Sequence, residues 1–229
     1  MAGFREQAYY CFSDSHILKG FDAICKTWFK VIKDYSEICK NEDAIYWYNE
    51  RASLSSFCAA LGRRGITFME EYSSLKGQGE NENKKSALSH GRVDLCFFHN
   101  DSWYIAEAKY LKRYFTPNGL QPALLSSPAL AKASQDAERS QKGDPGCHAL
   151  GLTFVTLSFG PNLYDTMNKQ LAEFIHELPE VISKLQKTSR GAFLAYCAPK
   201  NLRQLKSDSG WYFPMTLLLG KIVRKAKTT

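Results

Sequence analysis

Apolar residues recur at two spacings along the chain, and the spacing separates predicted helices from predicted strands. Steps of three and four residues are typical of a helix with one buried face, whereas alternation and short apolar runs are typical of strands. The predicted helices are the segments 12–40, 43–64, 128–143 and 162–187. The predicted strands are the segments 65–72, 91–98, 103–110, 149–159, 191–198 and 211–223. This mixture predicts an α/β protein with a central sheet between helices.

Local signals place several element ends. Ser13 or Ser15 could cap the first helix, and Asp43 could cap the second. Pro179 predicts a break or a kink in the fourth helix. The segment 73–90 is polar and poor in apolar residues, so we expect a flexible loop there.

The segment 91–110 predicts a β-hairpin. Two runs rich in β-branched and aromatic residues flank the turn-forming sequence His-Asn-Asp-Ser. If the strands close at Phe98 and Trp103, the numbers of paired residues sum to 201. A tighter turn that closes at His99 and Ser102 gives the same sum, so the register does not depend on turn length.

This register brings four ionisable side chains together. Asp94 is predicted to lie directly opposite Glu107, and Arg92 opposite Lys109. Directly opposed side chains have Cβ atoms about 4.5–5.5 Å apart, and alternate residues of a strand share one face. The remaining positions of both strands are mostly apolar, and a buried carboxylate is costly unless it is paired, neutralised or bound to a metal. The hairpin is therefore the candidate functional site.

Asp94, a gap of twelve residues, and then Glu107-Ala108-Lys109 resemble the motif of the PD-(D/E)xK nuclease superfamily. Val93 occupies the position before the first acid, where the motif typically has proline. The resemblance covers roughly the segment 43–159. It implies a restriction-endonuclease-like core, with a central mixed β-sheet flanked by helices.

The same resemblance implies a division of the chain and a set of roles. Residues 1–40 would form an N-terminal helical extension, and residues 41–229 the nuclease-like domain. The implied cofactor is Mg²⁺, with Mn²⁺ as a substitute. Its implied ligands and catalytic groups are Asp94, Glu107, the backbone carbonyl of Ala108, and Lys109, which would hold or help to deprotonate the attacking water.

Two further residues enter through the resemblance. Members of the superfamily often carry an acid on the helix before the first core strand, which makes Glu50 a candidate metal ligand. The alternative is that Glu50 reaches the helix edge and pairs with an arginine such as Arg92. The helix after the hairpin often carries a glutamine or lysine that orients water or phosphate, and Gln135 occupies that helix; the alternative is a surface polar position.

Composition adds limits to this interpretation. The net charge of +7 favours a polyanionic partner, here nucleic acid. The seven cysteines are odd in number and lack Cys-x-x-Cys spacing, which argues against a disulfide framework and a structural zinc site. No apolar run reaches the length of about 20 residues that a membrane span needs, so we expect a cytoplasmic protein without membrane partners.

The predicted function is a metal-dependent nuclease, with DNA favoured over RNA as substrate, acting in defence, restriction or repair. Making two cuts in a duplex would favour a homodimer. One alternative is a catalytically silent nucleic-acid-binding or assembly protein that keeps the fold. Others are a structural ion-pair cluster, in which Arg92 and Lys109 balance the two carboxylates, and an unrelated α/β protein with a fortuitous hairpin.

Overall fold

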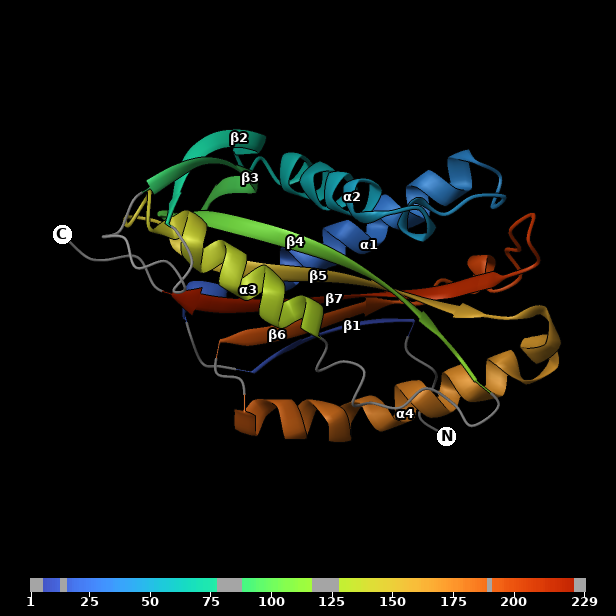
Figure 1. Cartoon of the computed structure of the whole chain (residues 1–229). Helices are drawn as coiled ribbons and strands as arrows, with labels where there is room; N and C mark the ends of the chain where they lie inside the picture. The colour runs from blue at the N-terminus through green and yellow to red at the C-terminus, as the bar shows by residue number, and fades with distance from the viewer. Residues whose placement is uncertain (1–5, 13–15, 78–87, 117–127, 189–190, 225–229) are drawn as a thin grey trace.

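The computed structural model describes residues 6–12, 16–77, 88–116, 128–188 and 191–224. Within these ranges the chain forms a seven-stranded mixed sheet flanked by four α-helices (Figure 1). The strands are β1 (Gln7–Cys11), β2 (Phe68–Gly77), β3 (Leu88–His99), β4 (Ser102–Tyr114), β5 (His148–Phe159), β6 (Ala192–Cys197) and β7 (Tyr212–Arg224). The helices are α1 (Phe21–Ile38), α2 (Glu50–Arg63), α3 (Pro128–Gln141) and α4 (Tyr164–Thr188). The predicted α/β class, with a central mixed sheet between helices, is confirmed.

The strands lie in the order β1-β6-β7-β5-β4-β3-β2. Strands β2, β3 and β4 are consecutive antiparallel neighbours, whereas β4 and β5 run parallel. Parallel neighbours need a crossover connection, and α3 lies between these two strands in the chain. Strand β4 is therefore the element on which the hairpin and the helical crossover meet.

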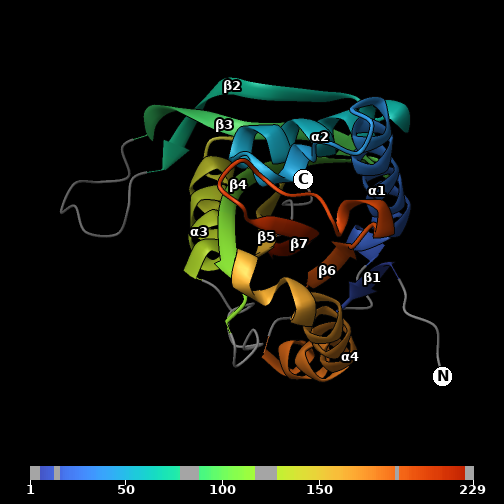
Figure 2. The same cartoon turned by 90° about the vertical axis from the view of Figure 1, so that its right-hand side faces the viewer.

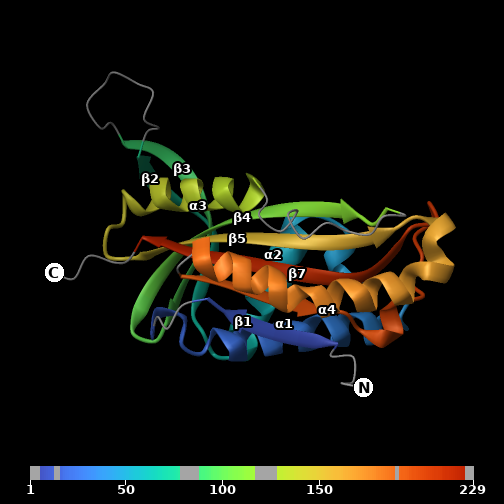
Figure 3. The ribbon, with the colours of Figure 1, turned by 90° about the horizontal axis from the view of Figure 1, so that it is seen from below.

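Helices cover both faces of the sheet (Figures 2 and 3). α1 and α2 pack on one face, and α3 and α4 lie on the other. Every residue of β5 is buried, and its side chains alternate between the two apolar clusters, as strand geometry requires. Leu150, Leu152 and Phe154 join the cluster under α1 and α2, whereas Val155 and Leu157 join the cluster under α4. No helix in the described parts of the chain is long and apolar enough to cross a membrane.

The N-terminal segment contributes more than the predicted helix. α1 lies inside the segment 12–40, but it begins after Gly20, and the proposed caps Ser13 and Ser15 lie outside the described residues. β1 was not predicted, and it pairs with β6 at one edge of the sheet. Because buried side chains of α1 belong to the same cluster as those of α2, β4 and β5, the core continues across the proposed boundary at residue 40.

The second helix starts later than predicted. α2 begins at Glu50, and the side chain of Asn49 accepts the N–H of Ala52, so Asn49 is the cap. The prediction of Asp43 as the cap is wrong, because its carboxylate accepts hydrogen bonds from the hydroxyls of Tyr35 (2.7 Å) and Tyr48 (2.8 Å). These contacts hold Asp43 in the connection before the helix.

Two other boundary predictions also need correction. Both described ends of the segment 73–90 are strand, because β2 continues to Gly77 and β3 starts at Leu88; residues 78–87 lie outside the described part. The polar residues of this hairpin carried no strand signal. Pro179 was predicted to break or kink the fourth helix; α4 continues as one helix through Pro179, so it is not broken there.

α3 packs closely on β5 at Gly151. A Cβ atom on Gly151 would lie 2.6 Å from the backbone nitrogen of Ser134 on α3. Gly151 is also the β5 residue paired with Glu107 of β4. The absence of a side chain at this position therefore brings α3 close to the sheet beside Glu107.

Gly151→Ala is expected to lower the free energy of unfolding by about 1–3 kcal/mol, because the added methyl overpacks the contact between α3 and β5. Urea denaturation measures the change. Gly146→Ala is the matched control, because Gly146 is exposed and its added Cβ would meet no atom within 4 Å. Equal stability of the two variants would contradict the close packing of α3.

Candidate active site

The β3–β4 hairpin has the predicted register. Asn100 and Asp101 both have positive φ, 48° and 57°, as a two-residue type I′ turn requires. Paired residues run from His99↔Ser102 to Leu95↔Ala106, so their numbers sum to 201 as predicted. The recorded pairing ends at Leu95↔Ala106, one residue before the expected pair of Asp94 and Glu107.

Beyond this point the two strands follow different neighbours. β3 continues along β2 to Leu88, and β4 continues along β5 to Tyr114. We call the region where β3 and β4 separate, beyond Leu95 and Ala106, the strand fork. The backbone N–H groups of β4 that face the fork have no strand partner there, and carboxylates accept them instead.

Two acids from distant parts of the chain meet β4 at the strand fork. Asp94 Oδ2 accepts the N–H of Ala108 at 2.8 Å. The backbone N–H of Tyr110, two residues further along the same strand, acts on the carboxylate of Glu50 and lowers its pKa. Since alternate N–H groups of a strand point in the same direction, both carboxylates lie on the side of β4 that β3 has left.

The connection before α2 positions Glu50. Thr156 Oγ1 donates to the carbonyl of Tyr46 at 2.6 Å, and the hydroxyl of Tyr46 donates to the carbonyl of Phe213 at 2.6 Å. Tyr110 Oη also donates to the carbonyl of Tyr46 at 3.3 Å. These bonds tie the connection to β4, β5 and β7, so the first turn of α2 is fixed relative to the fork.

Glu107 is the most deeply buried acid of the group, with 4% of its surface exposed. Its Oε1 accepts hydrogen bonds from Lys76 Nζ on β2 at 2.5 Å and from Ser140 Oγ on α3 at 2.6 Å. Burial raises the pKa of Glu107, the hydrogen bonds from Lys76 and Ser140 lower it, and the nearby charge of Asp94 raises it. The net pKa is raised, so burial and repulsion outweigh the two donors.

Lys76 reaches Glu107 by crossing Gly91. Ser74 is paired with Gly91, so Lys76 lies two residues further along β2. A Cβ atom on Gly91 would lie 2.6 Å from Cδ of Lys76. The missing side chain of Gly91 is therefore what lets the lysine stem pass over β3.

Glu50 is electrostatically coupled to the other residues of the fork. Burial raises the pKa of Glu50, the charge of Lys109 lowers it, the charge of Asp94 raises it, and the N–H of Tyr110 lowers it. Arg92, the alternative partner, instead pairs with Glu71 of β2, which also pairs with Arg51. Glu50 is thus part of the cluster that contains Asp94 and Lys109.

Lys109 points toward α3. Its Nζ donates to the carbonyl of its neighbour Ala108 at 2.7 Å and lies 3.7 Å from Asp136 Oδ2. Lys109 does not lie opposite Arg92 as predicted. The two strands have separated at that position, and Arg92 pairs with Glu71 of β2 instead. The Ala108 carbonyl, predicted as a metal ligand, accepts the lysine proton here.

The structure adds Lys76, Asp136 and Ser140 to the predicted site residues, and it places the predicted Gln135 away from them. Gln135 is exposed on α3, and no described interaction joins it to the carboxylates. Asp136 and Ser140 of the same helix reach Lys109 and Glu107. Their spacing of four residues, on the side that carries buried Ala133 and Ala137, was a usable signal. No sequence pattern indicated Lys76, because its contact with Glu107 depends on the pairing of β2 with β3.

Carboxylates gather at the strand fork. Glu50, Asp94 and Glu107 lie near the ammonium groups of Lys76 and Lys109. Lys109 also faces Asp136, which in addition pairs with Lys132 and Arg139. Among the described residues, hydrogen bonds involve only Oε1 of Glu107 and only Oδ2 of Asp94. One oxygen of each carboxylate therefore stays available for a cation.

These residues fit a hard divalent cation in ligand type. Within the described part of the chain, no group of three or more His, Cys, Asp and Glu side chains is arranged to hold a metal ion. Mg²⁺ typically uses only one or two protein carboxylates, with water and substrate phosphate oxygens completing its shell. Asp94 and Glu107 could supply that pair.

Comparisons with known proteins leave this geometry to be interpreted on its own. No protein-family model matches the chain, and no curated protein or solved structure matches it either.

Proposed function

We propose that this chain is a metal-dependent nuclease that hydrolyses phosphodiester bonds, with DNA favoured over RNA. The observation that carries the proposal is the meeting of Glu50, Asp94, Glu107 and Lys109 at the strand fork. They come from a helix and two strands, and their three carboxylates are mutually repulsive groups that a divalent cation would stabilise.

The order of elements around the fork supports the same proposal. α2 precedes the antiparallel strands β2, β3 and β4, and α3 then connects to β5, which is parallel to β4. A mixed sheet of this kind, between helices, is what the resemblance to the PD-(D/E)xK superfamily implies. The restriction-endonuclease-like core is part of the proposal.

Each residue of the fork has a role in the proposed reaction. Asp94 and Glu107 would hold the cation, and Glu50 would supply a further oxygen from the start of α2. A magnesium ion held there would supply Lewis-acid polarisation of a phosphoryl oxygen and a lowered pKa of water. Lys109 orients the attacking water and offsets the negative charge that develops on the phosphate in the transition state.

Burial of Glu107 serves the proposed chemistry. A low-dielectric site strengthens the interaction between a carboxylate and a cation, and Asp94 beside it adds a second negative charge. Because protons compete with the cation for Glu107, whose pKa is raised, cation uptake is expected to increase as pH rises through that pKa. The net charge of +7 favours a polyanionic substrate.

A second candidate is a catalytically silent nucleic-acid-binding protein with the same architecture. The observation in its favour is the ion pair between Lys76 Nζ and Glu107 Oε1 at 2.5 Å. This pair neutralises Glu107 internally, as a purely structural cluster would. It predicts nucleic-acid binding without metal-dependent cleavage.

Cleavage and cation uptake, measured in parallel, test the proposal. Plasmid DNA, single-stranded DNA and RNA are incubated with the protein and Mg²⁺ or Mn²⁺, with and without EDTA, and Mn²⁺ uptake is measured by calorimetry. We expect cleavage that EDTA abolishes, with both cleavage and Mn²⁺ uptake lost in Asp94→Asn. Glu173→Gln, an exposed acid of α4, is the control and should behave as wild type.

Two results would count against the nuclease. Cleavage that survives in Asp94→Asn would refute the assignment of the site. Nucleic-acid binding without cleavage under any metal condition would favour the silent protein.

A further inference from the structure

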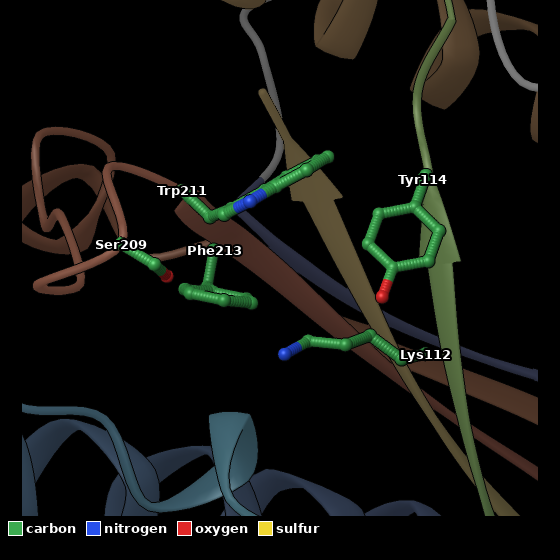
Figure 4. A pocket seen from close by; sticks show the side chains of 5 residues that line it. All are labelled: Lys112, Tyr114, Ser209, Trp211 and Phe213. Atoms are coloured by element: carbon green, nitrogen blue, oxygen red, sulfur yellow. The ribbon is translucent and has the colours of Figure 1, made fainter. Parts of the chain in front are cut away.

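A pocket lies at the end of β4 that is remote from the hairpin turn. It has a volume of about 430 Å³, and its lining comes from β4, from β7 and from the segment before β7 (Figure 4). The lining residues are Lys112, Tyr114, Ser209, Trp211 and Phe213. Pockets of about 300–1,000 Å³ with apolar walls and a few polar groups are typical of small-molecule sites.

Three aromatic rings and one cation define the chemistry of this pocket. Tyr114 and Trp211 have ring centroids 5.0 Å apart at an interplanar angle of 63°. Lys112 Nζ lies 4.4 Å from the ring centroid of Phe213. Tyr114 is 50% exposed, so its ring remains accessible to a ligand. A positive charge beside aromatic rings disfavours a cationic ligand and favours a planar group that carries negative charge nearby.

The aromatic residues are held in place before any ligand binds. Phe213 packs edge-to-face on Trp47 at 5.4 Å, and its carbonyl accepts the hydroxyl of Tyr46. The backbone N–H of Trp211 donates to Ser207 Oγ at 3.2 Å, and the carbonyl of Trp211 accepts the N–H of Ser207 at 2.9 Å. Fixed walls reduce the ordering cost of binding.

The pocket and the strand fork lie along the same strand. Tyr110, whose N–H lowers the pKa of Glu50, is two residues before Lys112. At about 3.3 Å per residue, Lys112 and Tyr114 lie roughly 10–16 Å along β4 from Lys109. Lys109 faces α3, whereas Lys112 and Tyr114 lie on the other face of β4 with Phe213, so a bound strand has to pass round the edge of β4 that β3 has left. A stacked single strand rises about 3.4 Å per nucleotide, so at least about 3 to 5 nucleotides are needed.

We propose that this pocket binds a nucleobase of a single-stranded nucleic acid, at least about 3 to 5 nucleotides from the phosphate at the strand fork. The base stacks on the ring of Trp211 with Tyr114 beside its edge, the hydroxyl of Ser209 meets its polar edge, and Lys112 lies against the adjoining phosphate. Stacking on aromatic side chains tolerates any base, so the pocket selects for an unpaired strand rather than for a sequence. The inference deepens the proposed nuclease and rests on it.

The test measures binding without metal, so that it does not depend on cleavage. Fluorescence anisotropy in EDTA compares a labelled single-stranded octathymidylate with an octamer of the same length whose residues are all abasic. The two probes carry the same phosphates and differ only in their bases. Variants are Trp211→Ala, Trp211→Phe and Trp103→Ala; Trp103 is the control because it is an exposed tryptophan beside the hairpin turn.

We expect wild type to bind the base-containing octamer about 5- to 150-fold more tightly than the abasic octamer. Trp211→Ala should lose this preference while its affinity for the abasic octamer stays unchanged. Trp211→Phe and Trp103→Ala should keep it. Retained near-ultraviolet circular dichroism establishes that Trp211→Ala is folded.

Two results would overturn the inference. Wild type without a preference for bases would exclude a base pocket, and equal weakening of both probes by Trp211→Ala would assign Trp211 a structural role. Failure of the nuclease proposal is a separate outcome: absent cleavage in Mg²⁺ and Mn²⁺, with the base preference intact, would refute catalysis and leave the pocket as a nucleobase site.

Discussion

Lys109→Ala is expected to lower the metal-dependent cleavage rate by about 10²–10⁴-fold, the range found for groups that assist proton transfer at the reacting centre. Lys109 is the ammonium group of β4 that lies beside the carboxylates, and its charge lowers the pKa of Glu50. Under the proposed function, its loss removes the group that holds water and offsets charge on the phosphate. Single-turnover cleavage of a labelled DNA measures the effect.

Two further variants separate catalysis from charge. Lys109→Arg keeps the positive charge but cannot give up its proton near neutral pH, so we expect it to bind DNA normally and to cleave slowly. Lys132→Ala is the matched control, because Lys132 pairs with the same Asp136 from the exposed side of α3. A wild-type rate in Lys109→Ala would remove Lys109 from the reaction.

Lys76→Met is expected to destabilise the protein by about 3 kcal/mol, because it leaves Glu107 buried without its counter-ion. We expect the lower end of the range for broken buried pairs, since 22% of the Lys76 side chain is exposed. The loss should appear in urea denaturation at neutral pH. Lys169→Met, which breaks an exposed pair on α4, should change stability by less than about 1 kcal/mol.

The pH dependence of Lys76→Met has a defined sign. The pKa of Glu107 is raised by burial in the wild type, and losing Lys76 removes an interaction that lowers it. A carboxyl with a raised pKa binds its proton more tightly in the folded state, so its contribution to stability falls as pH rises toward that pKa. The deficit of the variant should therefore shrink as pH is lowered. A deficit that is constant with pH would show that lost packing, rather than charge, is its cause.

A divalent cation should also restore stability in Lys76→Met. Under the proposed function the cation replaces the missing ammonium group beside Glu107, and a ligand at 100 times its Kd stabilises by about 2.7 kcal/mol. The double variant Lys76→Met with Glu107→Gln should be less sensitive to both pH and cation. Equal sensitivity of the single and the double variant would locate the response elsewhere.

Sequence patterns predict the parts of this fold whose contacts are local. The Asn100-Asp101 turn and the alternation on its flanking strands determine the hairpin register. The apolar run of β5 and the small residues of α3 identify two more elements of the site. These signals bring Asp94, Glu107 and Lys109 into one region without any coordinates.

Long-range pairings account for what the sequence does not predict. The hairpin ladder stops at Leu95↔Ala106 because β3 follows β2 while β4 follows β5, a competition between distant strands. The late start of α2 depends on phenol groups that engage Asp43. β1 is a short strand whose partner, β6, lies near the other end of the chain.

Because Gly91 has no side chain, Lys76 of β2 can reach across β3 to the carboxylate of Glu107. Lys76 neutralises Glu107, so this buried carboxylate has a counter-ion within the protein. Under the proposed function, a cation at Glu107 would take the place of this ammonium group. One positive charge would then replace another beside the buried acid, and the movement of a single flexible side chain across Gly91 would control how fast the cation binds.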